Sequence, residues 1–141
     1  MDQNPSINVG RSSTATTPDE GVETAWGPDF CETQEGAYQR VKDAFLRHHP
    51  DGDVALLDKA FAVGKVMHAS QKRKSGEPYF FHPIAVAQFM AEWRLDAVSV
   101  ACGMLHDTVE DTLMTLDAVR REFGDEVAEI VDGLTKLSKL D

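Results

Sequence analysis

The chain has 141 residues, of which 42% are hydrophobic and 27% charged, a length and composition typical of one globular domain. Its 24 acidic and 14 basic residues give a formal net charge of -10, which argues against direct binding of nucleic acid or of an anionic membrane. Two cysteines make a disulfide framework improbable. Because the sequence shows neither a signal peptide nor an apolar run of membrane-spanning length, we expect a cytoplasmic protein.

The N-terminal segment, residues 1–35, predicts a disordered acidic tail. Seven acidic residues stand there against one basic residue, Arg11, and Ser, Thr, Pro and Gly are frequent. Such a composition buries too little apolar surface to order a chain. The folded part is then residues 36–141. We expect it to be incomplete, the N-terminal part of a larger domain, because the amphipathic pattern of "LTKLSKLD" is still running at Asp141.

Apolar residues recur at helical spacing through the folded part, and no alternation of period two competes with them, so we predict an all-α fold of about five or six helices. The segments "AYQRVKDAFLRHH" and "DVALLDKAFAVGKVMHAS" form the first two, and Asp53 caps the second. A third helix is predicted to begin at His82 and Pro83, with the proline in its first turn. We expect the methionines, the phenylalanines and Trp93 to lie in the core.

Three further helices are predicted, the first of them capped by Asp96. One is expected to run without interruption from Asp96 to Asp111, and the last two begin at Thr115 and Asp125.

A basic loop, "QKRKSGEPYFF", separates the second and third helices, because Gly76 and Pro78 break the period. Three adjacent bases in a loop are usually a solubilising feature. In an acidic protein they could instead bind a phosphate-bearing substrate. His68, just before the loop, is more simply explained as a structural residue that holds the loop by a hydrogen bond.

The most informative stretch is "HDTVED", residues 106–111, which follows the apolar run "VACGML". On a continuous helix, His106, Asp107, Glu110 and Asp111 would share one turn. A solvated acidic face is the ordinary explanation of such a cluster. Three carboxylates beside apolar residues, however, repel one another and are partly desolvated, which favours a divalent cation or a positively charged partner.

A second histidine strengthens the metal hypothesis. His82 is held by a loop and by Pro83 at the start of another helix, so it offers an imidazole from a separate element. Histidine nitrogen together with carboxylate oxygen suits manganese, iron or zinc.

Three motifs in this order, "HASQKRKSGEPYFFHP", "MLHDTVEDT" and "FGDEVAEIVDGLTKLSKL", closely resemble the N-terminal hydrolase domain of the RelA/SpoT homologue family, the enzymes of the stringent response that make and destroy the alarmones guanosine tetra- and pentaphosphate, (p)ppGpp. The resemblance implies a helical HD-type phosphohydrolase, usually loaded with manganese. It would remove the 3′-pyrophosphate to give GDP or GTP and pyrophosphate.

The resemblance also implies roles for individual residues. The metal ligands would be His82, His106 and Asp107. Glu110 and Asp111 would position and activate the attacking water. In the loop, Arg73 would pack against the guanine base, with Lys74 and Ser75 beside it near the nucleotide.

One departure from the family pattern lowers the expected activity. The family's fourth protein ligand is an aspartate in a later motif similar to "LADRLHNMRT", which does not occur before Asp141. We therefore expect hydrolysis by this chain to be weak or absent. The alternative is a non-catalytic nucleotide-binding or protein-interaction fragment of a bifunctional synthetase/hydrolase, able to contact itself or further domains. A general HD nucleotidase that acts on other substrates has less support, because the loop motif "RKSGEPY" is more specific than the HD signature.

Overall fold

The computed structural model describes residues 32–138, and within them the fold is all-α, as predicted. These residues form seven helices and no strand, apart from an isolated bridge between Lys72 and Pro78. Two parts are described separately, the helical unit of residues 33–73 and 78–138 and the short turn of residues 74–77. Most of the predicted acidic tail lies outside the described residues.

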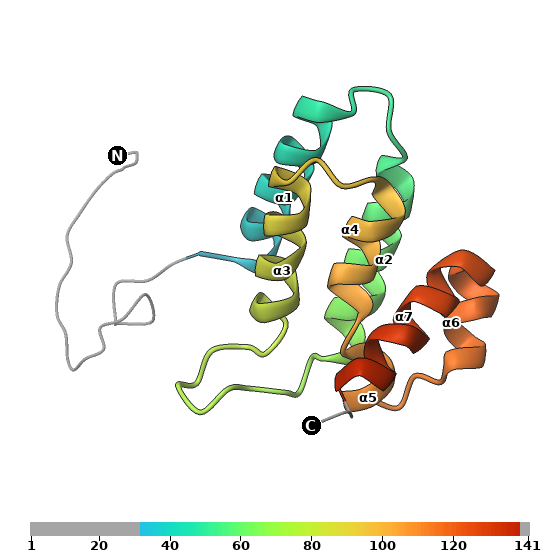
Figure 1. The fold of residues 1–141 in the computed structure, drawn as a ribbon. Coiled ribbons are helices and arrows are strands. Elements are labelled where there is room, and N and C mark those ends of the chain that lie inside the picture. The colour runs from blue at the N-terminus through green and yellow to red at the C-terminus, as the bar shows by residue number, and fades with distance from the viewer. Residues whose placement is uncertain (1–31, 139–141) are drawn as a thin grey trace, which may run out of the picture. The chain divides into compact units, whose positions relative to one another are not determined.

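The helices, labelled in Figure 1, are α1 (Gln34–His48), α2 (Val54–Met67), α3 (Phe81–Glu92), α4 (Ala97–Leu105), α5 (Thr108–Asp111), α6 (Leu116–Phe123) and α7 (Asp125–Ser138). The side chains of Asp53, Asp96 and Thr115 cap α2, α4 and α6 by accepting backbone N–H bonds, as the sequence indicates. Helix α1 begins at Gln34, so the last two residues of the segment predicted as a tail are helical.

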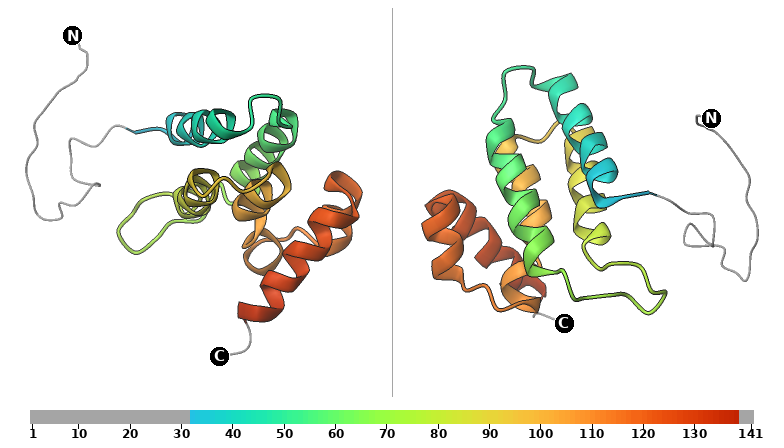
Figure 2. Two further views of the ribbon diagram at one scale, coloured as in Figure 1. Left: turned by 45° about the horizontal axis from the view of Figure 1, so that its top comes forward. Right: turned by 180° about the vertical axis from the view of Figure 1, so that it is seen from behind.

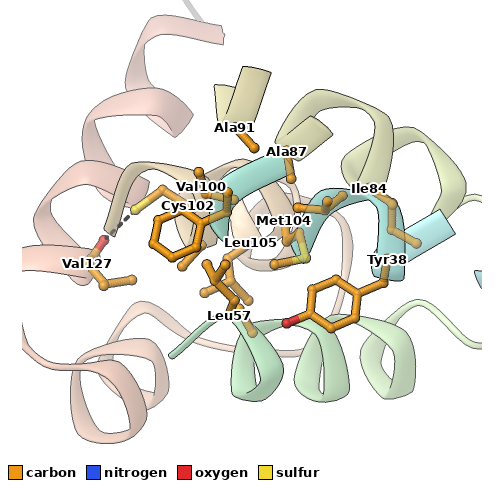
Figure 3. Packing of buried hydrophobic residues seen from close by; sticks show 14 of the residues in the cluster. Tyr38, Leu57, Ile84, Ala87, Ala91, Val100, Cys102, Met104, Leu105 and Val127 are labelled. Atoms are coloured by element: carbon orange, nitrogen blue, oxygen red, sulfur yellow. Dashed lines mark hydrogen bonds between the residues drawn. The ribbon is translucent and has the colours of Figure 1, made fainter. Parts of the chain in front are cut away.

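Helix α4 lies at the centre of the helical unit. It packs against α2, α3 and α7, while α1 packs against α3 and α6 against α7 (Figures 1 and 2). Its residues from Val100 to Leu105 are all buried. Figure 3 shows how α4 side chains such as Met104 fill the space between Leu57 of α2 and Ile84 of α3. The two histidine-bearing segments, at the start of α3 and the end of α4, are therefore carried on directly packed helices.

The helix expected from Asp96 to Asp111 is interrupted, which corrects the prediction of one continuous helix. Helix α4 ends at Leu105, and α5 begins at Thr108 after a turn at His106 and Asp107. The side chain of His106 bonds the carbonyl of Gly103 at 2.7 Å, the acceptor that the amide of Asp107 would use in an uninterrupted helix. His106 therefore lies outside the turn that carries Asp107, Glu110 and Asp111, which the bond from the Asp111 N–H to the Asp107 carbonyl closes at 2.8 Å.

The expectation that every aromatic residue at helical spacing is buried is also wrong. Phe45 and Phe80 are buried, but Phe89 and Trp93 lie on the outer face of α3 and are 58% and 72% exposed. Their rings contact each other at a centroid separation of 6.3 Å, four residues apart on the helix. Across the described residues, none of the helices combines the length and the apolar character that crossing a membrane requires.

Candidate metal centre

Three side chains from two elements meet at the interruption between α4 and α5. His82 comes from the first turn of α3, and His106 and Asp107 form the turn itself. Each offers one ligand atom, and these atoms lie within 4.8 Å of one another. The fold thus brings together the three residues that the sequence predicted as metal ligands, and their role as ligands stays a prediction.

The ring of His106 is oriented by the backbone of its own helix. Its Nδ1 lies 2.7 Å from the carbonyl oxygen of Gly103. A carbonyl oxygen only accepts, so Nδ1 is the donor in this bond, and in the neutral imidazole the lone pair is then on Nε2. That Nε2 faces Asp107 Oδ1 at 3.2 Å, and the ring meets the ring of His82 edge-on at 6.1 Å between centroids. The orientation is the one that a metal-binding histidine needs.

Gly103 also sets the separation of α3 and α4 beside the cluster. A Cβ added at this residue would lie 3.3 Å from Cα of Ala87 and 2.8 Å from Sδ of Met90, both on α3. The small residue permits a close approach of the two helix backbones, and that approach helps place His82 near His106.

The second oxygen of the Asp107 carboxylate is bound by Tyr79. The Tyr79 hydroxyl donates to Asp107 Oδ2 at 2.5 Å, and the Asp107 side chain is only 14% exposed. Burial, followed by the hydrogen bond and charge of Asp107, raises the pKa of Tyr79, so its hydroxyl remains a neutral donor at physiological pH. Asp107 therefore faces His106 with one oxygen and Tyr79 with the other.

The predicted catalytic acids, Glu110 and Asp111, lie on the single turn of α5 and are exposed. Partial desolvation, and then the charges of Asp107 and Glu110, raise the pKa of Asp111, while His68 and His106 act in the opposite direction. This is the carboxylate repulsion expected from the sequence. The structure places both acids next to the cluster along the chain, and their catalytic roles stay predictions.

The loop after α2 is anchored to α5 through a buried histidine. His68 is 1% exposed, and its Nδ1 lies 2.7 Å from Gln71 Oε1, which confirms the predicted hydrogen bond to the loop. The Gln71 amide nitrogen donates to the backbone carbonyl of Asp111 at 2.5 Å. Because the amide nitrogen is the donor there, Oε1 is the acceptor, and the proton of His68 must be on Nδ1.

The predicted nucleotide-binding residues are at or beside the turn of the loop. Arg73 is exposed, and its charge lowers the pKa of Tyr79 against the larger effects of burial and Asp107, so its guanidinium lies within electrostatic reach of that hydroxyl. Lys74 and Ser75 are exposed in the turn of residues 74–77, where Ser75 donates to Glu77 and Gly76 adopts a φ of 95°. Their contact with a nucleotide stays a prediction.

Two residues with direct bonds to this site, Tyr79 and Gln71, were not singled out by the sequence reasoning. Tyr79 stands in the aromatic run "YFF", where a tyrosine reads as a core residue, and Gln71 begins a loop defined by its bases. The position of Tyr79 three residues before a candidate ligand was the one available indication. Their partners are 28 and 40 residues away along the chain, so local spacing does not reveal them.

The donor set fits a divalent transition metal. Two imidazoles and one carboxylate suit manganese, iron or zinc better than calcium or magnesium, which prefer oxygen ligands alone. The hydrogen bonds of His106 to a backbone carbonyl and of Asp107 to a hydroxyl are the supporting contacts expected around such ligands. Three protein ligands also leave coordination positions for water or substrate.

The sequence is similar to a known domain family and to known proteins. A sequence profile of the HD domain matches residues 60–141. The chain is 44% identical over 109 residues to a GTP pyrophosphokinase of Myxococcus xanthus, covering 77% of this chain and 14% of that protein. It is 47% identical over 95 residues to the GTP pyrophosphokinase rsh of Brucella ovis, covering 67% of this chain and 13% of that protein. The chain thus spans about a seventh of the length of these relatives.

Proposed function

Because the chain belongs to the HD domain family and carries the HD region of the RelA/SpoT homologues, we propose that it provides a metal-dependent site that hydrolyses the 3′-pyrophosphate of (p)ppGpp, giving GDP or GTP and pyrophosphate. The relatives are named for pyrophosphate transfer to GTP, and that activity belongs to proteins far longer than this chain. The proposal concerns the HD region alone. It includes a cytoplasmic location, which the free, buried Cys102 and the cysteine usage support.

The observation that carries the proposal is the convergence of His82, His106 and Asp107 within 4.8 Å. These residues would hold the cation, which we propose to be Mn²⁺. When bound, such a cation lowers the pKa of water and offsets the charge of phosphoryl oxygens.

Glu110 and Asp111 are proposed to hold the attacking water and to accept its proton. A carboxylate whose pKa is raised is a stronger base than an ordinary one, and the pKa of Asp111 is raised by desolvation and by its acidic neighbours. Both side chains are exposed and follow the cluster by one helical turn, so a water beside them is accessible to substrate.

Arg73 is proposed to bind the nucleotide, with Lys74 and Ser75. A guanidinium plane can stack on a purine and at the same time attract phosphate, so it suits a ligand that offers both. The electrostatic influence of Arg73 on Tyr79, the partner of Asp107, supports a position on the side of the metal centre. In a chain of net charge -10, this basic loop is what would favour an anionic substrate.

A non-catalytic role in binding nucleotide or protein is the alternative. The observation that favours it is the exposure of three apolar side chains on and near the C-terminal helices, Leu113, Ile130 and Leu137, of which Leu113 is 94% exposed. Exposed apolar residues of this kind mark interaction surfaces when they are contiguous.

Mn²⁺ binding and pyrophosphate release distinguish the two functions. Binding is measured first, by titration of the protein with Mn²⁺, because three candidate ligands lie together among the described residues. Release of pyrophosphate from ppGpp is then followed with and without Mn²⁺. We expect Asp107→Asn and His106→Ala to abolish binding and any Mn²⁺-dependent release.

His48→Ala is the matched control for His106→Ala, because His48 is a half-buried histidine at the end of α1, outside the cluster. It should bind Mn²⁺ like the wild type. Mn²⁺ binding that survives Asp107→Asn would contradict the proposed centre, and nucleotide binding by a chain that does not bind Mn²⁺ would favour the alternative.

A further inference from the structure

We propose that Tyr79 is a positioning residue that restricts Asp107 to a single metal-facing oxygen. This inference rests on the proposed metal centre and adds a function for a residue outside the ligand set. The Tyr79 hydroxyl donates a hydrogen bond to Asp107 Oδ2 at 2.5 Å, while Asp107 Oδ1 faces Nε2 of His106 at 3.2 Å.

The two oxygens of Asp107 are therefore already distinguished without a cation. A carboxylate with both oxygens free can chelate a metal through both and so fill two coordination positions. With Oδ2 held by a hydroxyl, Asp107 offers Oδ1 alone, and the position that the second oxygen would fill remains available to water or substrate. The low exposure of the Asp107 side chain, 14%, limits competition by solvent for the Tyr79 bond.

Tyr79 is itself held from several directions. Its backbone N–H donates to the carbonyl of Gln71 at 2.9 Å, and its ring contacts the buried His68 at 5.3 Å between centroids. Its ring also lies 5.9 Å from that of His82. A hydroxyl carried by a ring with two such ring contacts is confined to a narrow range of positions.

The same residue also fixes the backbone of a second candidate ligand. The carbonyl of Tyr79 accepts the backbone N–H of His82 at 2.9 Å, at the beginning of α3. Tyr79 thus bonds His82 through its main chain and Asp107 through its side chain. It connects ligands that come from different elements, which is the arrangement expected of a residue that sets their relative position.

A simpler explanation is that Asp107 only satisfies the hydrogen-bonding capacity of a partly buried tyrosine. The chain contains a matched case, because its only other tyrosine, Tyr38, donates to Asp58 Oδ1 at 2.6 Å on α1 and α2, and neither residue belongs to the cluster. Tyr79→Phe and Tyr38→Phe each remove one hydroxyl and keep the ring. A purely structural bond predicts similar effects of the two substitutions on stability and none on metal binding.

The test is the Mn²⁺ affinity of Tyr79→Phe, Tyr38→Phe and Asp107→Asn, measured on the full chain by the electron paramagnetic resonance of free Mn²⁺. We expect Tyr79→Phe to weaken binding by about 10- to 100-fold, the usual effect of removing a partner of a metal ligand, and Tyr38→Phe to leave it unchanged. The visible absorption of bound Co²⁺, which reports coordination number, should change in Tyr79→Phe and not in Tyr38→Phe. Wild-type affinity and an unchanged Co²⁺ spectrum in Tyr79→Phe would overturn the inference.

A second measurement needs no substitution and covers the case in which Tyr79→Phe does not fold. Protein labelled with fluorotyrosine should give two ¹⁹F resonances, since the sequence has two tyrosines. Adding Zn²⁺, which is diamagnetic, should shift the Tyr79 resonance and leave that of Tyr38 in place; if neither moves, the inference is wrong. Binding in the wild type that Asp107→Asn does not reduce would instead refute the metal centre itself, and this inference with it.

Discussion

The side-chain nitrogen of Gln71 lies 2.5 Å from the backbone carbonyl oxygen of Asp111 and joins the loop after α2 to the end of α5. Helix α5 is a single turn of four residues, too short to be stable alone, so it depends on such tertiary bonds. The other end of the Gln71 amide accepts from the buried His68. One side chain thus connects a buried histidine to the segment that carries the proposed catalytic acids.

Gln71→Ala should destabilise the protein by about 1–3 kcal/mol, because it removes both bonds and leaves Nδ1 of the buried His68 without its acceptor. Urea unfolding measures the effect. Gln39→Ala is the control, since the Gln39 side chain bonds Asp43 on the exposed face of α1, and its loss should cost about a few tenths of a kcal/mol. Equal effects of the two substitutions would show that the Gln71 bridge contributes nothing beyond a surface contact.

Gly103→Ala should lower stability by about 1–3 kcal/mol and weaken Mn²⁺ binding. The added Cβ would press on Ala87 and Met90 of α3 and move His82 away from His106. The melting temperature and a Mn²⁺ titration test both effects. Gly133→Ala is the control, because nothing lies within 4 Å of the Cβ position there. In α7 it should stabilise the protein by up to about 1 kcal/mol, so a loss of stability in that variant would contradict the packing argument.

Asp111→Asn should stabilise the metal-free protein at neutral pH. The raised pKa of Asp111 means that the folded protein holds this proton more tightly than the unfolded chain does. The stability contributed by the protonated carboxyl is present below the unfolded pKa and is lost as pH rises through the folded pKa. Solvent screens the exposed side chain, so the gain is only on the order of a few tenths of a kcal/mol. Urea unfolding should show it at pH 7 and not at pH 3.

Asp96→Asn should change the stability at pH 7 in the direction opposite to Asp111→Asn, and it serves as the comparison for that variant. The bond from the Ser99 backbone N–H lowers the pKa of Asp96, so the Asp96 carboxylate stabilises the fold above its unfolded pKa and loses this effect as pH falls through the folded pKa. The substitution should therefore destabilise the protein at pH 7 and have less effect at pH 3. A gain in stability at pH 7 would contradict the assigned cause.

Mn²⁺ should raise the melting temperature of the wild type. At a free concentration 100 times its Kd, a ligand that binds only the folded state adds about 2.7 kcal/mol to stability. Thermal unfolding monitored by circular dichroism, with and without Mn²⁺, measures this shift. Asp107→Asn should show no shift, because one of the three clustered candidate ligands is lost. A shift of the same size in that variant would indicate that Mn²⁺ binds elsewhere on this acidic chain.

Helix starts were the most predictable part of the fold. Asp53 and Asp96 were expected as caps and Thr115 as the start of a helix, and each accepts the N–H of a residue three positions later. A cap and its partner are neighbours along the chain, so the pattern is visible in the sequence. Burial was less predictable. Trp93 has the spacing of a core residue but is 72% exposed at the end of α3, and its exposure depends on how the helices pack.

The pattern "HDTVED" and the position of His82 at a helix start were enough to propose a metal site with histidine and carboxylate ligands, because both features are local. The break between α4 and α5 and the binding of Asp107 by Tyr79 followed only from the folded arrangement. At the break a side chain bonds a backbone acceptor of the helix, and the Tyr79 bond spans 28 residues. Such competition between a side chain and the helix, and contacts at long range, depend on packing energies that residue spacing does not encode.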